Sequence, residues 1–228
     1  MRMDRYKASS IEAFEGSLAD RYDISLLVRL LDLTVMDDFV VDALGEKVAD
    51  LAILDVGCGT GRLLERLAGA GAKRLAGSDL TYRMIELTRK RLAPLDIDLD
   101  LHRADTENGL PWPSESFGAV IGTGVLHHFY HPGSALGEMG RVLEKGGQLI
   151  LADPCFFTPL REIFNAALRI RPRAGDYYFY SVRQAARLLS THGWMVERCE
   201  RLNWWAYGVV ARPRTWPRDL QTQGSQGR

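Results

Sequence analysis

The sequence has few cysteines and no long apolar run. Cys58, Cys155 and Cys199 are an odd number of widely spaced thiols, which excludes a disulfide framework and a cysteine-based zinc cluster. No stretch approaches the ~18 apolar residues of a membrane-spanning helix, and the charged first ten residues precede no apolar segment of the kind that a secretion signal needs. We therefore expect a cytoplasmic protein with no membrane span and no metal site.

The sequence also has no surplus of charge of one sign. Its 29 Lys and Arg residues balance 29 Asp and Glu residues, so the formal net charge is +0 at pH 7. Proteins that hold nucleic acid mainly through its phosphates usually carry a basic surplus, so we expect no nucleic-acid partner. The 228 residues, 46% hydrophobic and 25% charged, are typical of a globular protein with a sizeable core.

Short apolar runs alternate with helical stripes between residues 51 and 153. Alternation of this kind predicts a mostly parallel sheet with helices on both faces. Ligands bind such sheets beyond the carboxyl ends of the strands, so functional residues are expected directly after each strand. We expect strands over 51–56, 75–78, 97–101, 119–123 and 149–152, helices over 61–70, 84–92 and 132–143, and a turn at 146–147.

The pattern changes after residue 153. Residues 154–180 are rich in aromatic and basic side chains, with a helix expected near 159–169. Ser181 and Gln184 have the spacing of a capping box and predict the start of a helix that ends near Gly193. Two further strands, joined at Asn203, are expected to pair antiparallel.

The sharpest local feature is the glycine-rich loop LDVGCGTGRLL at 54–64. Glycines after a strand let the backbone turn tightly and approach a ligand, and the helix that follows offers unpaired N–H groups. The dinucleotide fingerprint G-x-G-x-x-G does not fit, because Gly61 comes one residue early. A phosphate-binding P-loop does not fit either, since Arg62-Leu63 stands where Lys-Ser or Lys-Thr is needed. The loop favours a small ligand with amino-acid and nucleoside parts.

Two acidic residues follow the next two predicted strands. Asp79 lies 24 residues after Asp55, where a carboxylate can accept hydrogen bonds from both ribose hydroxyls. Its alternative role is to stabilise the start of the following helix. Asp105 follows the third strand and could accept a hydrogen bond from an adenine amino group, or be an ordinary loop acid. Together with the glycines, this spacing favours a nucleoside site.

With these motifs the chain resembles the class I S-adenosylmethionine-dependent methyltransferases, and within them the small-molecule enzymes of ubiquinone biosynthesis and of natural products. LDVGCGTG occurs together with LPWPSESFGAVIGTGVLHHF and HPGSALGEMGRVLEKGGQLILADP, so the resemblance covers 51–153, with weaker similarity to 211. The resemblance implies S-adenosylmethionine as the cofactor. It also implies an α/β, Rossmann-like fold whose seven-stranded sheet is mostly parallel with an antiparallel last strand and helices on both faces.

Taken with the composition, the resemblance divides the chain into five parts. They are an N-terminal helical lid (1–50), a cofactor-binding Rossmann-like core (51–153), a substrate-side lid (154–180), a C-terminal helix with an antiparallel strand pair (181–212) and a flexible tail (213–228).

The resemblance also implies which residues bind the cofactor. They are Asp55 and the glycines Gly57, Gly59 and Gly61 at the methionine part, Asp79 at the ribose, Leu80 on the adenine ring, Asp105 and Thr106 at its edge, Gly122 and Thr123 at the amino-acid end, and Tyr22, which would close the site from the N-terminal helices.

Three residues past strand ends are candidates for a catalytic base: His127, His128 and Asp153. The sulfonium of the cofactor already makes its methyl group electrophilic, so the protein mainly has to align the nucleophile for in-line displacement. A base is needed only if that nucleophile carries a proton of high pKa, and histidine is the natural base near neutral pH. For each candidate the alternative is a structural role in the loop.

The predicted function is methyl transfer to O, N or C of an aromatic or apolar small molecule by a monomer or homodimer. The acceptor is expected between the N-terminal helices and 154–180, whose aromatic residues could stack on it or form packing contacts instead. Four arginines, Arg161, Arg169, Arg171 and Arg173, could meet a carboxylate or phosphate on the acceptor or form a solvated face. The alternative functions are an RNA or protein methyltransferase of the same fold and a non-catalytic protein that binds S-adenosylmethionine.

Overall fold

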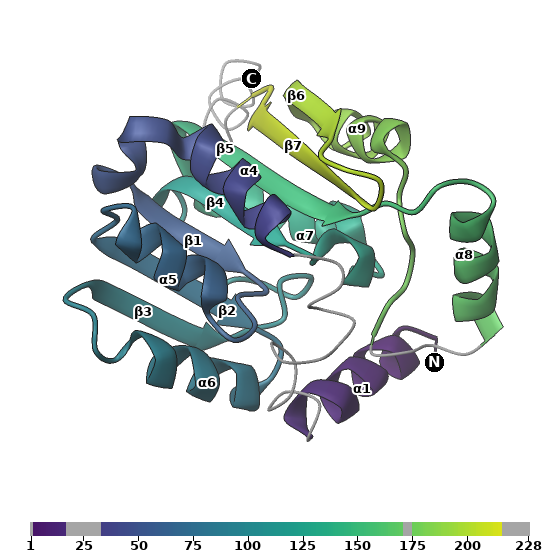
Figure 1. Ribbon diagram of the computed structural model, residues 1–228, viewed down its shortest axis with the longest axis horizontal. Helices are drawn as coiled ribbons and strands as arrows, with labels where there is room; N and C mark the ends of the chain where they lie inside the picture. The colour runs from purple at the N-terminus through teal and green to yellow at the C-terminus, as the bar shows by residue number, and fades with distance from the viewer. Residues whose placement is uncertain (1, 17–32, 171–174, 216–228) are drawn as a thin grey trace, which may run out of the picture.

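The computed structural model describes residues 2–16, 33–170 and 175–215 and contains one seven-stranded sheet (Figure 1). The strand order is β3-β2-β1-β4-β5-β7-β6. β1 to β5 are parallel, and β7 is antiparallel to both β5 and β6. The predicted fold is confirmed. The strands are β1 (Ala52–Val56), β2 (Arg74–Asp79), β3 (Asp98–Arg103), β4 (Phe117–Thr123), β5 (Leu143–Pro154), β6 (Trp194–Arg201) and β7 (Ala206–Pro213).

Helices cover both faces of the sheet (Figure 1). On the near face in that view lie α4 (Thr34–Leu44), α5 (Arg62–Gly69) and α6 (Tyr82–Leu92), and on the far face α7 (Pro132–Val142) and α9 (Val182–Thr191). Two more helices, α1 (Arg2–Glu15) and α8 (Leu160–Ile170), lie beyond the carboxyl ends of the parallel strands. Short 3-10 turns occupy η1 (Gly45–Ala49) and η2 (Leu126–His128). No described helix is long and apolar enough to cross a bilayer.

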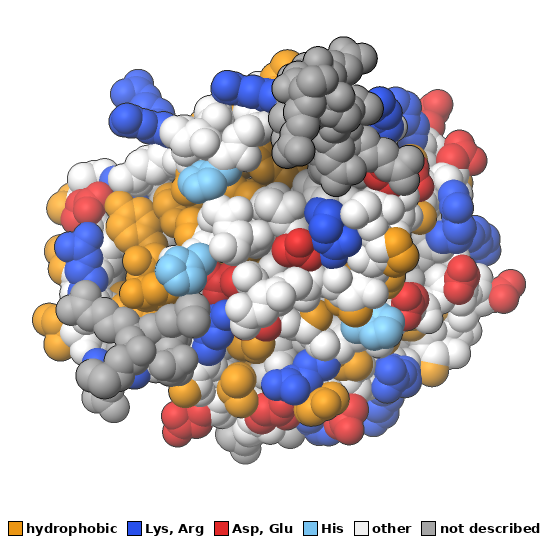
Figure 2. Space-filling model, turned by 180° about the vertical axis from the view of Figure 1, so that it is seen from behind, with side chains coloured by type: hydrophobic (Ala, Val, Ile, Leu, Met, Phe, Trp, Pro, Cys, Tyr) orange, Lys and Arg blue, Asp and Glu red, His pale blue; other side chains and the backbone are white. Residues whose placement is uncertain are grey.

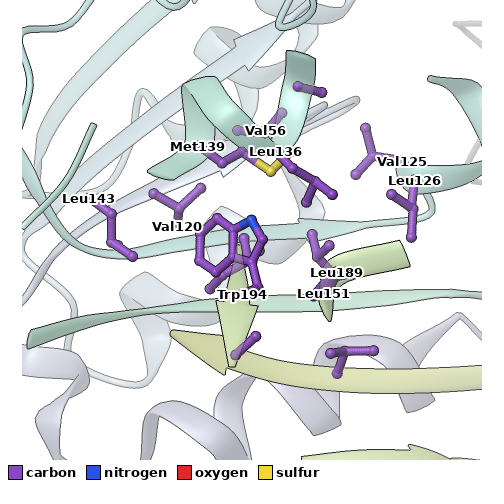
Figure 3. Packing of buried hydrophobic residues seen from close by; sticks show 14 of the residues in the cluster. Val56, Val120, Val125, Leu126, Leu136, Met139, Leu143, Leu151, Leu189 and Trp194 are labelled. Carbon is purple, nitrogen blue, oxygen red and sulfur yellow. The ribbon is translucent and has the colours of Figure 1, made fainter. Parts of the chain in front are cut away.

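The central strands β1 and β4 are mostly apolar because both of their faces are buried. In β1, Leu54 and Val56 join the cluster under α7 and α9, whereas Ile53 joins the cluster under α4, α5 and α6. The alternation follows from the two-residue period of a strand. Figure 3 shows the first cluster, where Leu136 and Met139 of α7 pack with Trp194 of β6.

Two local features bear directly on the sequence predictions. The capping box at the start of α9 is present, with reciprocal hydrogen bonds between Ser181 and Gln184. β5 begins earlier than predicted, because Leu143 already pairs with Phe117. The register between β4 and β5 then shifts. The expected turn at 146–147 is instead an irregular stretch within β5, where Gly146 has a φ of 85°.

The first glycine of the loop after β1 gives a stability prediction. Gly57 has a φ of 71°, and a Cβ there would lie 2.7 Å from Cγ2 of Val125. We expect Gly57→Ala to lower the free energy of unfolding by about 1–3 kcal/mol, through backbone strain and the clash. Gly69→Ala is the matched control, since Gly69 lies in α5 with no atom within 4 Å of an added Cβ. Urea denaturation measures both, and equal midpoints for Gly57→Ala and wild type would contradict the prediction.

Candidate active site

The loops that follow β1, β2, β3 and β4 meet α1 around one cleft. The cleft encloses about 1180 Å³, open solvent at its mouth included. Because these loops follow neighbouring parallel strands, residues far apart in the sequence meet at one edge of the sheet. Of the residues singled out from the sequence, those that line the cleft are Asp55, Gly57, Gly59, Asp79, Leu80, Asp105, Thr106, Thr123 and His128.

The predicted glycines divide into two groups. Gly57 and Gly59 line the cleft, with φ values of 71° and 55°. Gly61 and Gly122 lie behind it, among the described residues that do not line the cleft. A Cβ on Gly61 would lie 2.9 Å from Cγ2 of Thr88, and one on Gly122 would lie 2.7 Å from Cγ1 of Val125. Close packing therefore accounts for these two glycines.

Asp79 connects the glycine loop with the start of α6. One oxygen of its carboxylate accepts a hydrogen bond from the backbone N–H of Gly59 at 3.1 Å. The other accepts from the backbone N–H and the hydroxyl of Thr81, at 3.0 and 3.1 Å. Burial raises the pKa of Asp79, and these hydrogen bonds oppose the rise. The carboxylate organises both loops while its side chain remains part of the cleft wall.

Asp55 is a buried acid at the base of the cleft. Its side chain is 2% exposed, and its Oδ1 has no hydrogen-bond partner within the described part of the chain. Burial raises the pKa of Asp55, and the neighbouring Asp37 raises it further. A buried oxygen without a partner is costly, so this position favours a donor supplied by a ligand.

Asp105 and its neighbours are tied to α1. Asp105 accepts hydrogen bonds from the backbone N–H of Glu107 at 3.2 Å and from the side-chain amide of Asn108 at 2.7 Å. Lys7 of α1 forms ion pairs with Asp105 and, at 3.0 Å, with Glu107. Burial lowers the pKa of Lys7, but the two carboxylates outweigh it and hold the pKa above its usual range.

The carboxyl end of α1 is held as well. Glu15 accepts hydrogen bonds from the backbone N–H groups of Tyr82 and Arg83, at 2.8 and 3.3 Å. These are the first residues of α6, where a helix favours negative charge. α1 is thus held at Lys7 and at its carboxyl end, and its Tyr6, Lys7, Ser10 and Phe14 line the cleft.

These α1 residues were not predicted from the sequence. Tyr22, which the resemblance implied as the closing residue, lies outside the described residues. No local motif marks Lys7 or Glu15, since their partners are about 70 to 100 residues away and only the folded chain brings them together.

The predicted catalytic candidates occupy different positions. Asp153 is fully buried and accepts hydrogen bonds from the backbone N–H groups of Leu126 and His127, at 3.2 and 3.1 Å. It also contacts Nδ1 of His127 at 3.1 Å. Nε2 of His127 lies 3.5 Å from Asp176, a residue that sequence analysis missed. Burial lowers the pKa of His127, but the two carboxylates outweigh it and raise the pKa well above its ordinary value.

His128 is the one of the three that lines the cleft. Its Nδ1 lies 3.6 Å from Asp176 and makes no hydrogen bond within the described residues, and its side chain is 26% exposed. Burial lowers the pKa of His128, and so does the positive charge of His127, whose ring centre lies 4.0 Å away. Asp176 opposes the shift. A neutral histidine therefore faces the cleft, with a charged histidine behind it.

Ligand atoms of His127, His128 and Asp176 lie within 4.8 Å of one another, a spacing that a metal ion could use. Both ring nitrogens of His127, however, already lie beside carboxylates. Charge pairing explains the cluster, and we assign no metal to it.

Comparison with known proteins supports the same family. A family model described as "Methyltransferase domain" matches residues 54–151. Demethylmenaquinone methyltransferase from Deinococcus radiodurans is 32% identical over 72% of this chain and 67% of its own length. tRNA U34 carboxymethyltransferase from Cellvibrio japonicus is 39% identical, but over only 46% of this chain and 33% of its own length.

The fold also matches solved structures. Magnesium protoporphyrin IX methyltransferase from Synechocystis PCC 6803, solved with bound S-adenosylhomocysteine (SAH), superposes with a TM-score of 0.69. The match covers 92% of this chain and 100% of that one at 19% identity, so it supports the fold alone. From the family match, the sequence relatives and the fold together, the chain belongs to the class I S-adenosylmethionine-dependent methyltransferases, a family of enzymes whose cofactor is S-adenosylmethionine.

Proposed function

We propose that this enzyme methylates a small-molecule acceptor and that His128 removes a proton from the acceptor's nucleophile. The observation that carries the proposal is the position of His128. Its imidazole lines the same cleft as Asp79 and Asp105, and its surroundings favour the neutral form that can accept a proton. His127 is buried behind it between two carboxylates, and Asp153 is fully enclosed.

The cleft fits the family's cofactor. Bound there, S-adenosylmethionine would supply an electrophilic methyl group on its sulfonium. Asp79 and Asp105 offer carboxylate oxygens for the nucleoside, and Gly57 and Gly59 leave space where a Cβ would narrow the wall. The unpartnered oxygen of Asp55 suits a donor from the amino-acid part. Leu80, Thr106 and Thr123 complete this wall.

The remaining residues position the reacting groups. Asp153 holds the backbone of η2 through Leu126 and His127 and thereby sets the direction of the His128 side chain. The helix α1, fixed at Lys7 and Glu15, covers the cleft and limits access of water. Exclusion of water strengthens electrostatic interactions within a site and keeps the reacting atoms aligned.

The acceptor class is supported by composition and by one relative. A net charge of +0 disfavours a phosphate-rich partner, and Phe14 and Phe129 give the cleft apolar surface suited to an aromatic or apolar molecule. The Deinococcus radiodurans relative is named for a quinone, demethylmenaquinone. We therefore favour a small molecule with an acidic hydroxyl, such as a quinol or a phenol.

Methyl transfer from labelled S-adenosylmethionine to separate panels of quinols, phenols, amines and bulk tRNA tests this proposal. We expect label in at least one small molecule and none in tRNA. Label in RNA alone would overturn the acceptor class, and calorimetric binding of SAH with no transfer to any panel would favour a non-catalytic role.

An RNA methyltransferase is the second candidate, because a tRNA-modifying relative matches part of the chain. A gel shift with tRNA at two salt concentrations separates the candidates. RNA binding through phosphates weakens steeply as salt rises, whereas we expect no shift at either concentration.

A further inference from the structure

The helix α8 buries two polar side chains and exposes two isoleucines, unlike an ordinary surface helix. Arg161, Asn165 and Leu168, spaced four and three apart, form the buried stripe. On the opposite side Ile163 is 61% exposed and Ile170 is 80% exposed. A surface helix normally buries its apolar stripe and exposes its polar one. Here two polar side chains point inward beside Leu168, whereas Ile163 and Ile170 point outward.

The inward polar residues have partners, so the orientation of α8 is well determined. The side-chain amide of Asn165 donates to the carbonyl of Phe179 at 3.1 Å and accepts from the N–H of Phe179 at 2.8 Å. Arg161 is paired with Glu162 at 2.7 Å. The hydroxyl of Tyr6 donates to the carbonyl of Leu168 at 3.2 Å, which ties α8 to α1. Rotating the helix to hide Ile163 and Ile170 would break the hydrogen bonds of Asn165 with Phe179 and of the Leu168 carbonyl with Tyr6.

The exposed side chains form an apolar patch, defined here as Phe157, Ile163, Phe164 and Ile170. Phe157 is 54% exposed and lies just before α8, where its carbonyl accepts the N–H of Arg161. The side of the molecule that carries α8 lies at the left of Figure 2, where hydrophobic side chains gather at the surface. A contiguous exposed apolar patch often marks a site where a protein binds a partner or a membrane.

The surroundings of the patch combine an exposed indole with arginines. Trp204 is 61% exposed in the turn between β6 and β7. Arg201 donates to the carbonyl of Trp204 at 3.0 Å and to that of Cys155 at 3.3 Å, which holds this turn beside the chain that leads into α8. Arg169, in the last turn of α8, is exposed as well. Tryptophan, aliphatic residues and arginine together are typical of surfaces that rest on a lipid headgroup layer.

The size and shape of the patch favour a lipid surface over a second copy of the chain. Its exposed area is roughly 450 Å², at about 200 Å² for each fully exposed large side chain. A stable dimer interface needs about 800 Å² from each partner. α8 also lies at one end of the molecule, set off from the sheet (Figure 1). An isolated helix can insert its outer stripe between lipids without a complementary protein face.

We propose that α8 is a membrane-contact helix, whose outer stripe of Ile163 and Ile170 inserts into the headgroup region of a lipid bilayer. The proposal concerns a surface outside the cleft and does not depend on methyl transfer. It leaves the chain peripheral to the membrane, since only one side of the helix is apolar.

Sedimentation with vesicles of equimolar phosphatidylcholine and phosphatidylglycerol tests the proposal with the full chain. We expect the wild-type protein to sediment with the vesicles and the double variant Ile163→Glu/Ile170→Glu to bind at least about tenfold more weakly. The double variant Leu95→Glu/Met195→Glu is the matched control, because Leu95 is 37% exposed and Met195 is 50% exposed outside α8, and the two substitutions add the same two negative charges. The control should bind as wild type does.

Three outcomes would overturn the proposal: no sedimentation of the wild-type protein, equal sedimentation of the double variant, or a wild-type dimer in light scattering that the double variant converts to monomer. The last would assign the patch to a second copy. Calorimetry with SAH on each variant reports on folding and on the cleft. If the double variant loses vesicle binding but keeps the wild-type affinity for SAH, the loss is due to α8 and not to misfolding. If the wild-type protein does not bind SAH, the proposed function is wrong, and the α8 proposal is unaffected.

Discussion

Replacing Asp79 by alanine should weaken the binding of SAH by roughly 100-fold or more. The change removes the acceptor for the N–H of Gly59 and for both donors of Thr81, so the loops after β1 and β2 lose their common anchor. It also removes the carboxylate expected to bind the ribose. A hydrogen bond to a charged group contributes about 1.5–3 kcal/mol, and each 1.4 kcal/mol corresponds to about tenfold in affinity. Isothermal titration calorimetry measures the effect.

Asp98→Ala is the matched control for this change, because Asp98 is an exposed acid at the start of β3. The control should bind SAH as tightly as wild type. Thr81→Val then separates the two roles of Asp79, since it removes the side-chain cap of α6 and keeps the carboxylate. Unchanged affinity in Asp79→Ala would show that this carboxylate does not hold the nucleoside.

Replacing His128 by alanine should lower kcat by roughly 10²- to 10⁴-fold, the usual contribution of a general base. The affinity for SAH should stay within about threefold of wild type, because the residues expected to hold the cofactor are elsewhere in the cleft. His102→Ala is the control, since His102 is exposed on β3 outside the cleft lining. Turnover at saturating cofactor measures both, and a His128→Ala enzyme with near wild-type kcat would leave alignment alone as the source of catalysis.

The pH dependence of kcat follows from the lowered pKa of His128. A histidine with a lowered pKa remains neutral, and able to accept a proton, as the pH falls below the ordinary value of about 6.5. The fall of kcat on the acid side of the pH profile should therefore have its midpoint below pH 6.5. In His127→Asn a positive charge beside His128 is lost while Asp153 and Asp176 remain, so the acid limb should move to higher pH. An acid limb at or above pH 6.5 in the wild type would contradict the assignment.

Much of the sheet and of the cleft wall was predictable because the signals are local. The glycine loop and the capping box at Ser181 depend on residues a few positions apart. In the structure Gly57, Gly59 and Asp79 line the cleft and the capping box is present, whereas Gly61 packs behind the cleft. The apolar runs of β1 and β4 predicted buried central strands because burial on both faces leaves little room for polar residues.

The features that the sequence did not predict depend on distant partners. Nothing near Lys7 or Glu15 indicates that one meets Asp105 and the other the start of α6. Asp176 lies in a segment without periodicity, although it helps to set the charge of both histidines. The orientation of α8 was hidden for the same reason, because the partner that turns Asn165 inward is the backbone of Phe179. Tertiary contacts override local preference at each of these places.

The position of β7 has a consequence for synthesis of the chain. Among the described residues β7 is the last strand along the chain, yet it lies between β5 and β6 and is the strand that joins β6 to the sheet. A nascent chain that ends before Ala206 therefore leaves the edge of β5 open and gives β6 no neighbour for hydrogen bonding. Open strand edges invite pairing with other chains. The growing polypeptide is thus exposed to aggregation until β7 emerges from the ribosome.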